Sequence, residues 1–470
     1  MAGKTIVGNG TMKALSPMAA SNAAANLVRW LVNSIADRGR AFLNDPARSS
    51  LNRLCQDLVS ERGEASGTAI AREIATRYRD LNTAERTQFF DSLLEREWLA
   101  DPDEVLRLAR AYHAHPGPDE LAKLFPVAEP RRQELFRRIN MGPRGTETLV
   151  QMRADLLALL RKHPRFSPID MDLVHLLSSW FNRGFLELRR IDWRTSALIL
   201  EKLISHEAVH EIRGWPDLRR RLEQDRRCFA FFHPALPDEP LIFVEVALRH
   251  GMAESIEPLI DVASKPEDLT LADTAVFYSI NNCLDGLRSI SFGAFLIKQV
   301  VYELQKDVPA LKHFVTLSPI PRFREWLLSR PAGEVDAIPG LSGIARATLR
   351  KSTAGNAAND AAKTALLRAC ARYLTSHRAD RRALDPVAAF HLSNGASIER
   401  INWMGDPSEK GIKQSYGLMV NYAYRPARIE RNHEHYAKNG KFAMSDEVRE
   451  LLETPAGKNG KPRKDDEGQP

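Results

Sequence analysis

Cysteine and long apolar runs are both scarce in this sequence. Its 470 residues include 4 cysteines, and no two of them stand at the CxxC spacing of a zinc ribbon; they are Cys55, Cys228, Cys283 and Cys370. Such sparse cysteines argue against a disulfide scaffold and favour a reducing compartment. No run approaches the ~18 apolar residues that a membrane-spanning helix requires, so we expect no membrane partner.

The sequence also lacks a block of charge of one sign. It contains 67 Lys and Arg against 60 Asp and Glu, which gives a formal net charge of +7. Because the two signs are interspersed, the composition permits a polyanionic ligand but does not indicate nucleic acid, and we expect no nucleic-acid partner. A ligand carrying several phosphates would need only a few local cations.

The two ends of the chain are poor in apolar residues. Residues 1–21 and 455–470 are small, polar and without period, and we expect both to be disordered. The first acidic residue is Asp37, and Lys4, Lys13 and several serines precede it, a composition that also occurs in mitochondrial transit peptides. We expect a cytoplasmic protein, with a mitochondrial one as the alternative.

Helical periodicity dominates residues 22–190. Apolar residues recur at intervals of three and four, for example at Leu149, Met152, Leu156 and Leu159, and Asp101 precedes a helix start at Pro102. Strand signals are nearly absent. This part is predicted to be an all-α bundle, and since it offers no catalytic constellation, we assign it to packing or oligomerisation.

The pattern changes near residue 191 and then mixes strands with helices up to residue 454. Two helices, around 197–204 and 215–222, precede strands at 227–232 and 241–248, which a proline-rich loop joins as a hairpin. The predicted fold class is therefore a multidomain α+β protein, with the helical bundle followed by an α/β domain.

The stretch 277–326 carries the clearest local chemistry. A strand passes through a polar turn into a helix at Leu296, and a second strand, 313–317, ends at Ser318, where Pro319 and Pro321 should force the backbone out of the ladder. The turn from Arg288 to Ala294 fits a pattern that N-acetyltransferase folds place around the pyrophosphate of coenzyme A, because free helix amides attract anions. On its own, the turn is better explained as an ordinary strand-to-helix connection, because short motifs often match by chance.

One zinc-protease motif needs to be weighed. His206, Glu207 and His210 match HExxH, in which two histidines one helical turn apart bind zinc and the glutamate activates water. The sequence Gly214-Trp215-Pro216 stops the helix soon afterwards, and no third ligand follows at the expected spacing. We expect no metal site here, and a partly exposed helix end instead.

Six segments of the second half together resemble the malonyl-CoA decarboxylase family. They are FYSI at Phe277, GAFLIKQVV at Gly293, LSPIPRF at Leu317, DPVAAFHLSNGA at Asp385, RINWM at Arg400 and GLMVNY at Gly417. The resemblance covers about residues 191–424. It implies a catalytic domain related to the GNAT acyltransferase superfamily, conversion of malonyl-CoA to acetyl-CoA and CO2, a homo-oligomer that is usually a tetramer, and no metal, biotin or pyridoxal cofactor.

The resemblance also implies particular site residues. The catalytic serine corresponds to Ser318, the catalytic histidine to His391 and a late tyrosine to Tyr424. Ser291 stands where the coenzyme A pattern expects glycine and where some animal members carry an acidic residue. The expected substrate-binding residues are Arg288, Ser289, Ile290, Ser291, Phe292, Gly293, Ala294, Lys298 and Asn394.

The chemistry of such a reaction agrees with these residue types. Loss of CO2 from a malonyl thioester leaves an enolate, so the site needs donors for the thioester oxygen and a proton for carbon. Histidine suits proton delivery near neutral pH, and a serine can orient the carboxylate. Backbone amides near Ser318 or at Asn394 and Gly395 are candidate oxyanion donors. An acyltransferase on the same fold and a non-catalytic coenzyme A-binding protein are the alternatives.

Overall fold

The computed structural model describes residues 50–290, 296–331, 333–334, 341 and 360–453. Contacts divide the chain into two compact units, Met1–Leu177 with Asp285–Leu287, and Ser178–Leu284 with Arg288–Pro470. Among the described residues, no helix is both long and apolar enough to cross a membrane. The predicted disordered ends, residues 1–21 and 455–470, lie outside the described residues.

The described part of the first unit is helical, as predicted from its periodicity. Its helices are α2 (Leu51–Leu58), α3 (Arg62–Asp80), α4 (Thr83–Ser92), α5 (Pro102–Ala114), α6 (Pro118–Ala128), α7 (Arg131–Asn140), α8 (Gly145–Leu160) and α9 (Ser167–Trp180). Asp101 caps α5 by accepting a hydrogen bond from the Asp103 amide, which confirms that predicted helix start. The core consists of apolar side chains at helical spacing, among them Leu149, Met152 and Leu156.

The second unit is built on an eight-stranded mixed sheet, in the order β1-β2-β3-β4-β5-β8-β6 with β7 also paired to β8. Only β4 and β5 pair in parallel among the pairs described. The strands are β1 (Glu187–Ile191), β2 (Arg226–Phe232), β3 (Ile242–Arg249), β4 (Thr274–Asn282), β5 (His313–Thr316), β6 (Ser318–Pro319), β7 (Ser397–Asn402) and β8 (Met419–Ala423).

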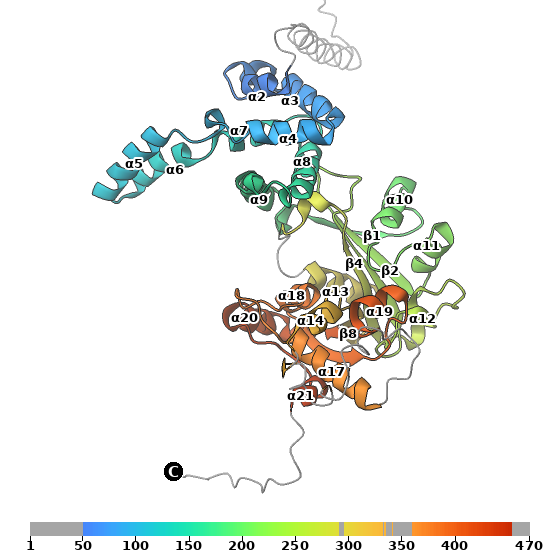
Figure 1. The fold of residues 1–470 in the computed structure, drawn as a ribbon. Helices are drawn as coiled ribbons and strands as arrows, with labels where there is room; N and C mark the ends of the chain where they lie inside the picture. Colours follow the sequence, from blue (N-terminus) through green and yellow to red (C-terminus); the bar gives the residue numbers. More distant parts are fainter. Residues whose placement is uncertain (1–49, 291–295, 332, 335–340, 342–359, 454–470) are drawn as a thin grey trace, which may run out of the picture. The chain divides into compact units, whose positions relative to one another are not determined.

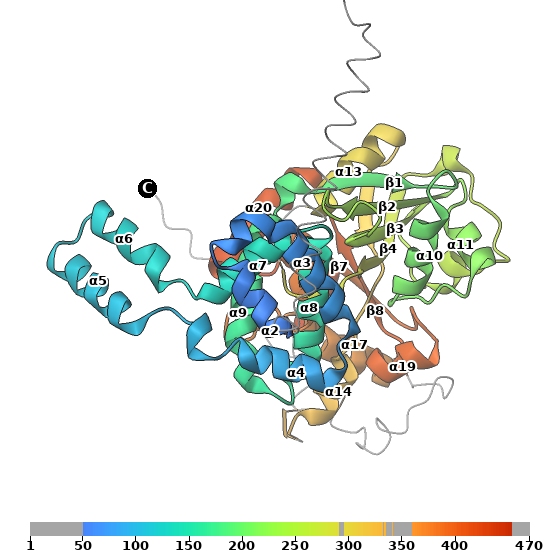
Figure 2. The same cartoon turned by 90° about the horizontal axis from the view of Figure 1, so that it is seen from above.

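Helices cover both faces of this sheet. The helices of this unit are α10 (Ala197–His206), α11 (Trp215–Arg221), α12 (Glu257–Ile260), α13 (Leu296–Asp307), α14 (Phe323–Ser329), α17 (Asp360–Leu374), α18 (Pro386–Ser393), α19 (Glu409–Ser415), α20 (Ile429–Asn439) and α21 (Asp446–Leu452). Cys228, Ala230 and Phe232 of β2 pack against the helices α10 and α11, which lie beside the sheet in Figures 1 and 2. Phe229 points to the opposite face, toward Asp307 of α13, as strand alternation requires. The predicted fold class is confirmed.

Two strands depart from the sequence prediction. β1 begins at Glu187, inside the stretch predicted to be helical, and the predicted domain boundary at residue 190 falls within it. Its charged sequence, ELRRI, carries little strand signal, because β1 forms by pairing with the apolar strand β2. The ladder also continues past Ser318, since Ser318 and Pro319 pair with Val420 and Met419 of β8. The expectation that Pro319 would leave the ladder was therefore wrong.

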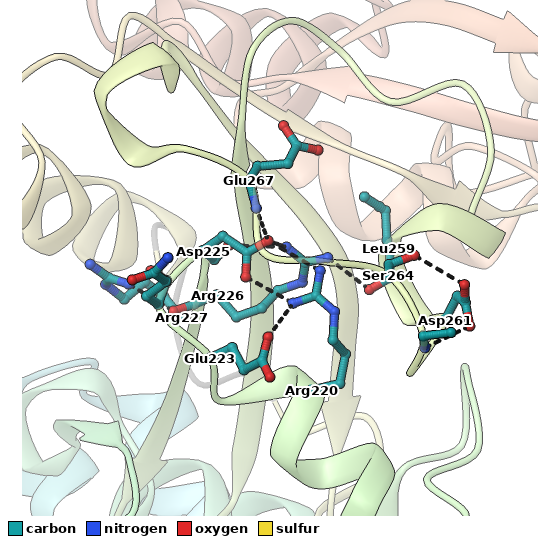
Figure 3. Close-up of polar contacts among 11 residues, drawn as sticks. Arg220, Glu223, Asp225, Arg226, Arg227, Leu259, Asp261, Ser264 and Glu267 are labelled. Atoms are coloured by element: carbon teal, nitrogen blue, oxygen red, sulfur yellow. Dashed lines mark hydrogen bonds and ion pairs between the residues drawn. The ribbon is translucent and has the colours of Figure 1, made fainter.

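A buried cluster of charges stands at the start of β2 (Figure 3). Asp225 is fully buried, and its carboxylate accepts bidentate hydrogen bonds from Arg220 at 2.8 and 3.1 Å and a third from Arg226 at 2.6 Å. The Glu267 amide adds a fourth at 3.0 Å. Although burial acts to raise the pKa of Asp225, these donors hold that pKa below its usual value. The cluster ties α11, β2 and the segment after α12 together.

Candidate active site

Ser318 stands where two strands of the sheet separate. Parallel pairing between β4 and β5 runs from Thr274 opposite His313 to Phe277 opposite Thr316, and the Leu317 amide still donates to the Phe277 carbonyl at 2.8 Å. β4 continues to Asn282 in pairing with β3 alone. The sheet thus opens directly beside Ser318, which β6 holds against β8.

His391 reaches Ser318 from α18. Its Nε2 lies 3.1 Å from the Ser318 hydroxyl, and its Nδ1 lies 2.8 Å from the Tyr424 hydroxyl. The imidazole stacks on the ring of Tyr422, with centroids 4.5 Å apart and an interplanar angle of 23°. The structure therefore brings the three residues named as catalytic, Ser318, His391 and Tyr424, into one hydrogen-bonded chain.

The two ends of α18 explain the placement of His391. Asp385 caps the helix by accepting from the Ala388 amide at 2.8 Å, and Pro386 takes the first helical position. Gly395 ends the turn at φ 83°, where a Cβ would lie 2.2 Å from the Ile429 carbonyl oxygen. His391 lies in the last turn of α18, between these two ends.

The site is buried and holds neutral groups. The exposed fraction is 6% for Ser318 and 3% for His391. Burial lowers the pKa of His391 to about 3, because the charged imidazolium loses its solvation. Burial likewise raises the pKa of Tyr424 well above its usual value. At neutral pH the free protein therefore holds a neutral imidazole between two hydroxyl groups.

The predicted substrate-binding residues are distributed differently. Arg288 and Ser289 are exposed at the start of the predicted turn and Ile290 is buried, whereas Ser291, Phe292, Gly293 and Ala294 lie outside the described residues. Lys298, on α13, forms an ion pair at 2.5 Å with Glu430 of α20. Neither arrangement tests a role in coenzyme A binding.

Asn394 and Gly395 are engaged in the end of α18. The Asn394 amide donates to the Phe390 and His391 carbonyls at 3.1 Å, and the Gly395 amide donates to Leu392 at 3.0 Å. The Asn394 side chain also donates to Phe390 at 2.8 Å. Since both amides already donate within the end of α18, they are poor candidates for oxyanion donors.

The HExxH segment has a structural explanation. α10 ends at His206, so His206 and His210 do not share a helix as a zinc site of this type requires. Glu207 is buried and accepts four hydrogen bonds, from the amides of Val209 and His210 and from the side chains of Ser279 and Asn281. The segment is thus the partly exposed helix end that was expected, and its buried Glu207 is hydrogen-bonded to β4. Among the residues with described positions, no three His, Cys, Asp or Glu side chains are grouped to hold a metal ion.

Two further side chains belong to the site but were not predicted from the sequence. The Thr316 hydroxyl lies 2.9 Å from that of Ser318, and the Tyr422 ring supports His391. Strand alternation could have found both, because Thr316 precedes Ser318 by two residues and Tyr422 precedes Tyr424 by two.

Comparison with known proteins covers both units. Residues 184–461 match the model of the malonyl-CoA decarboxylase C-terminal domain, and residues 98–181 match that of the N-terminal domain. The mitochondrial malonyl-CoA decarboxylase of Anser anser anser is 34% identical over 426 residues, covering 83% of this chain and 84% of the goose protein. The Mus musculus mitochondrial enzyme is 36% identical over 352 residues, covering 69% of this chain and 71% of the mouse protein.

Solved structures of malonyl-CoA decarboxylases are also similar to this chain. The crystal structure of malonyl-CoA decarboxylase from Rhodopseudomonas palustris is similar at a TM-score of 0.77 and 44% identity, covering 85% of this chain and 98% of that one. The Agrobacterium vitis structure has a TM-score of 0.75 and 47% identity, covering 86% of this chain and 100% of the other.

Proposed function

Because this chain belongs to the malonyl-CoA decarboxylase family, we propose that it converts malonyl-CoA to acetyl-CoA and CO2 with Ser318 and His391 as its catalytic pair. Membership makes the chain a decarboxylase enzyme. The observation that carries the proposal is the 3.1 Å contact between the Ser318 hydroxyl and His391 Nε2, beside the point where β4 and β5 separate.

The substrate position follows from this opening. The coenzyme tail would lie in the opening where β4 and β5 separate, with its phosphates on the turn from Arg288 to Ala294 and with Lys298 on the adjoining helix. Helix amides and nearby cations favour phosphate at such a turn. The malonyl group would then reach Ser318, which binds and orients its carboxylate. Asn394, at the end of α18, would lie next to the malonyl group.

The reaction requires one proton. When the bond between the carboxylate and the methylene carbon breaks, its electron pair forms the thioester enolate and CO2 leaves. A bound carboxylate beside His391 favours the imidazolium, so the histidine takes up a proton when the substrate binds. The proton then passes from Nε2, by way of the Ser318 hydroxyl, to the enolate carbon, and this gives acetyl-CoA and a neutral imidazole.

Turnover by purified enzyme tests the assignment. We expect acetyl-CoA formation from malonyl-CoA in the presence of EDTA, since the proposed reaction needs no metal or organic cofactor. Ser318→Ala should lose ~10²-fold or more in kcat while coenzyme A binding, measured by calorimetry, persists. Ser415→Ala, which removes another buried hydroxyl in the same unit, is the matched control.

Three outcomes would redirect the proposal. Full activity of Ser318→Ala would remove the serine from the mechanism. Turnover that depends on an added amine would indicate an acyltransferase. Coenzyme A binding by folded wild-type protein without turnover would indicate a binding protein instead.

We also propose that the protein is a homo-oligomer, and specifically a tetramer, that assembles through the helical unit. The exposed apolar surface of α5 and α6 supports this, with Phe125 at 70% and Leu106 at 48% exposure. α6 buries none of its residues, and it pairs with α5 (Figures 1 and 2). Exposed apolar patches of this kind often mark interfaces.

Light scattering after size-exclusion chromatography tests the assembly. Phe125→Glu should reduce the mass from tetramer toward dimer or monomer, whereas Lys123→Ala, on the same helix, should not. A wild-type monomer would refute the oligomer, and an unchanged mass for Phe125→Glu would move the interface elsewhere.

For localisation we propose the cytoplasm, where reduced thiols persist and the 4 cysteines are buried and unpaired. The curated relatives from goose and mouse are named as mitochondrial, so a mitochondrial location is the alternative. Fractionation of the source cells distinguishes the two. No nucleic-acid or membrane partner is part of this proposal.

A further inference from the structure

Thr316 is a buried polar residue whose hydroxyl stands between two strands. It is the last residue of β5 and is fully buried. Its Oγ1 accepts a hydrogen bond from the Tyr422 amide of β8 at 3.0 Å, and its carbonyl accepts from the Asn421 side chain at 2.7 Å. Both contacts fix Thr316 to the strand that also carries the ring against which His391 stacks.

The Thr316 hydroxyl directs its remaining hydrogen-bonding capacity at Ser318. The two oxygens are 2.9 Å apart, because residues two positions apart on an extended chain share a face. An amide can only donate, so the Tyr422 contact uses one lone pair of the threonine and leaves its proton and second lone pair for Ser318. Thr316, Ser318, His391 and Tyr424 therefore form one continuous hydrogen-bonded chain.

This chain can be polarised in two directions. If Tyr424 donates to Nδ1 of His391, then the Nε2 proton points to Ser318, and the serine proton is accepted by Thr316. If the Thr316 proton points to Ser318, the serine donates to Nε2 and the imidazole proton lies on Nδ1. In both cases the threonine oxygen determines where the serine hydroxyl proton points when no substrate is bound.

We propose that Thr316 is a positioning residue that holds the Ser318 hydroxyl in line with Nε2 of His391. The inference rests on the proposed function, because it assigns Thr316 a role through Ser318. Without this support the hydroxyl of Ser318 can rotate about its Cα–Cβ bond away from the imidazole, and a small misplacement of a reacting group slows the reaction markedly. Binding of the coenzyme should be unaffected.

The test compares kcat and KM for malonyl-CoA in three variants. Thr316→Val removes the hydroxyl at nearly constant shape and should lower kcat about tenfold, with KM within about twofold of wild type. Thr316→Ser restores the hydroxyl and should restore kcat. Thr274→Val removes the hydroxyl of a buried threonine at the start of β4, bonded to Asp273, and should leave kcat unchanged.

Wild-type kcat in Thr316→Val would overturn the inference, and so would a Thr316→Ser variant as slow as the valine variant. If Thr316→Val does not fold, Thr316→Cys takes its place, since a thiol is a weak hydrogen-bonding group of similar size. The same loss of kcat is expected for it, and wild-type turnover would again refute the inference.

A double variant separates this inference from the proposed function. If Thr316 acts through Ser318, then Thr316→Val combined with Ser318→Ala should be no slower than Ser318→Ala alone. A further drop would show a general structural role and contradict the inference. Full activity of the Ser318→Ala single variant would instead refute the proposed role of Ser318. That result can be interpreted without any threonine variant, so the two failures are distinguishable.

Discussion

Two buried polar clusters of the α/β unit differ in whether their groups are charged. The Asp225 cluster consists of full charges, and its carboxylate receives donors from two guanidinium groups and an amide (Figure 3). The Ser318 cluster, made of Thr316, Ser318, His391 and Tyr424, holds only neutral groups. Both are almost completely shielded from water.

The difference indicates what each cluster can do. A carboxylate saturated by charged donors is held in one protonation state, so it stabilises structure but cannot easily exchange a proton. A neutral imidazole between hydroxyl groups can change its protonation state when a charged substrate arrives. Burial alone therefore does not distinguish the two clusters, whereas the balance of charge within each cluster does.

The largest expected effect comes from His391→Asn. Loss of the proton donor should lower kcat by ~10³-fold, the range of general acid catalysis. The unfolding free energy should change by less than about 1 kcal/mol, because one neutral hydrogen-bonding group replaces another. Steady-state kinetics together with urea unfolding measure both quantities. A variant that loses stability and activity together would place His391 in the structural class with Asp225.

Asp225→Asn should give the opposite result. Removal of the charge leaves Arg226 buried without its ion-pair partner and leaves Arg220 with Glu223 alone, at 3.4 Å. The unfolding free energy should therefore fall by about 3–5 kcal/mol. Per folded molecule, kcat should stay near the wild-type value. Asp307→Asn is the matched control, because Asp307 also pairs with arginines but is 32% exposed, and its loss should be far smaller. Equal losses for both variants would contradict this assignment.

Local sequence predicted most elements of both units. The hairpin of β2 and β3 and the buried stripe of α13 appeared where their periodicity placed them. β1 and β6 did not, because each depends on a partner far away in the sequence rather than on its own residues. A strand with the sequence ELRRI is specified by its neighbour β2.

Only part of the site could be predicted from the sequence. Ser318, His391 and Tyr424 came from the resemblance to a family, since periodicity cannot bring residues 318, 391 and 424 together. Thr316 needed only strand alternation once Ser318 was chosen, yet its second anchor, the Tyr422 amide, is a product of the sheet order. The burial that lowers the pKa of His391 is a property of the whole fold.

Asp385, which caps the helix of His391, should make the stability of the protein depend on pH. Burial raises the pKa of Asp385 to about 6, although the Ala388 amide and Tyr373 hydroxyl act against the rise. The folded state therefore binds a proton that the unfolded state releases near pH 4, so this group costs stability as pH rises from about 4 to 6, by roughly 3 kcal/mol. His391, with its lowered pKa, acts in the opposite direction below pH 6.5.

Asp385→Asn isolates the contribution of Asp385 to the pH dependence of stability. The amide keeps the cap but does not titrate, whereas His391 contributes equally to both proteins. The stability of the variant relative to wild type should therefore rise as pH increases from 4 to 7, when both are unfolded in urea. A difference that does not change with pH would show that Asp385 is already ionised at pH 4.

The smallest expected effect is that of Tyr424→Phe, which distinguishes the role of Tyr424 from that of His391 in the Ser318 cluster. Tyr424→Phe removes the hydroxyl that contacts Nδ1 at 2.8 Å but leaves the ring, which packs edge-on against Phe277. We expect kcat to fall about three- to tenfold with little change in KM, because the imidazole loses one orienting hydrogen bond and keeps Ser318. A loss as large as that of His391→Asn would make the tyrosine itself the proton donor. An unchanged kcat would make it a core residue, and the hydrogen-bonded chain that matters would then run from Thr316 through Ser318 and end at His391.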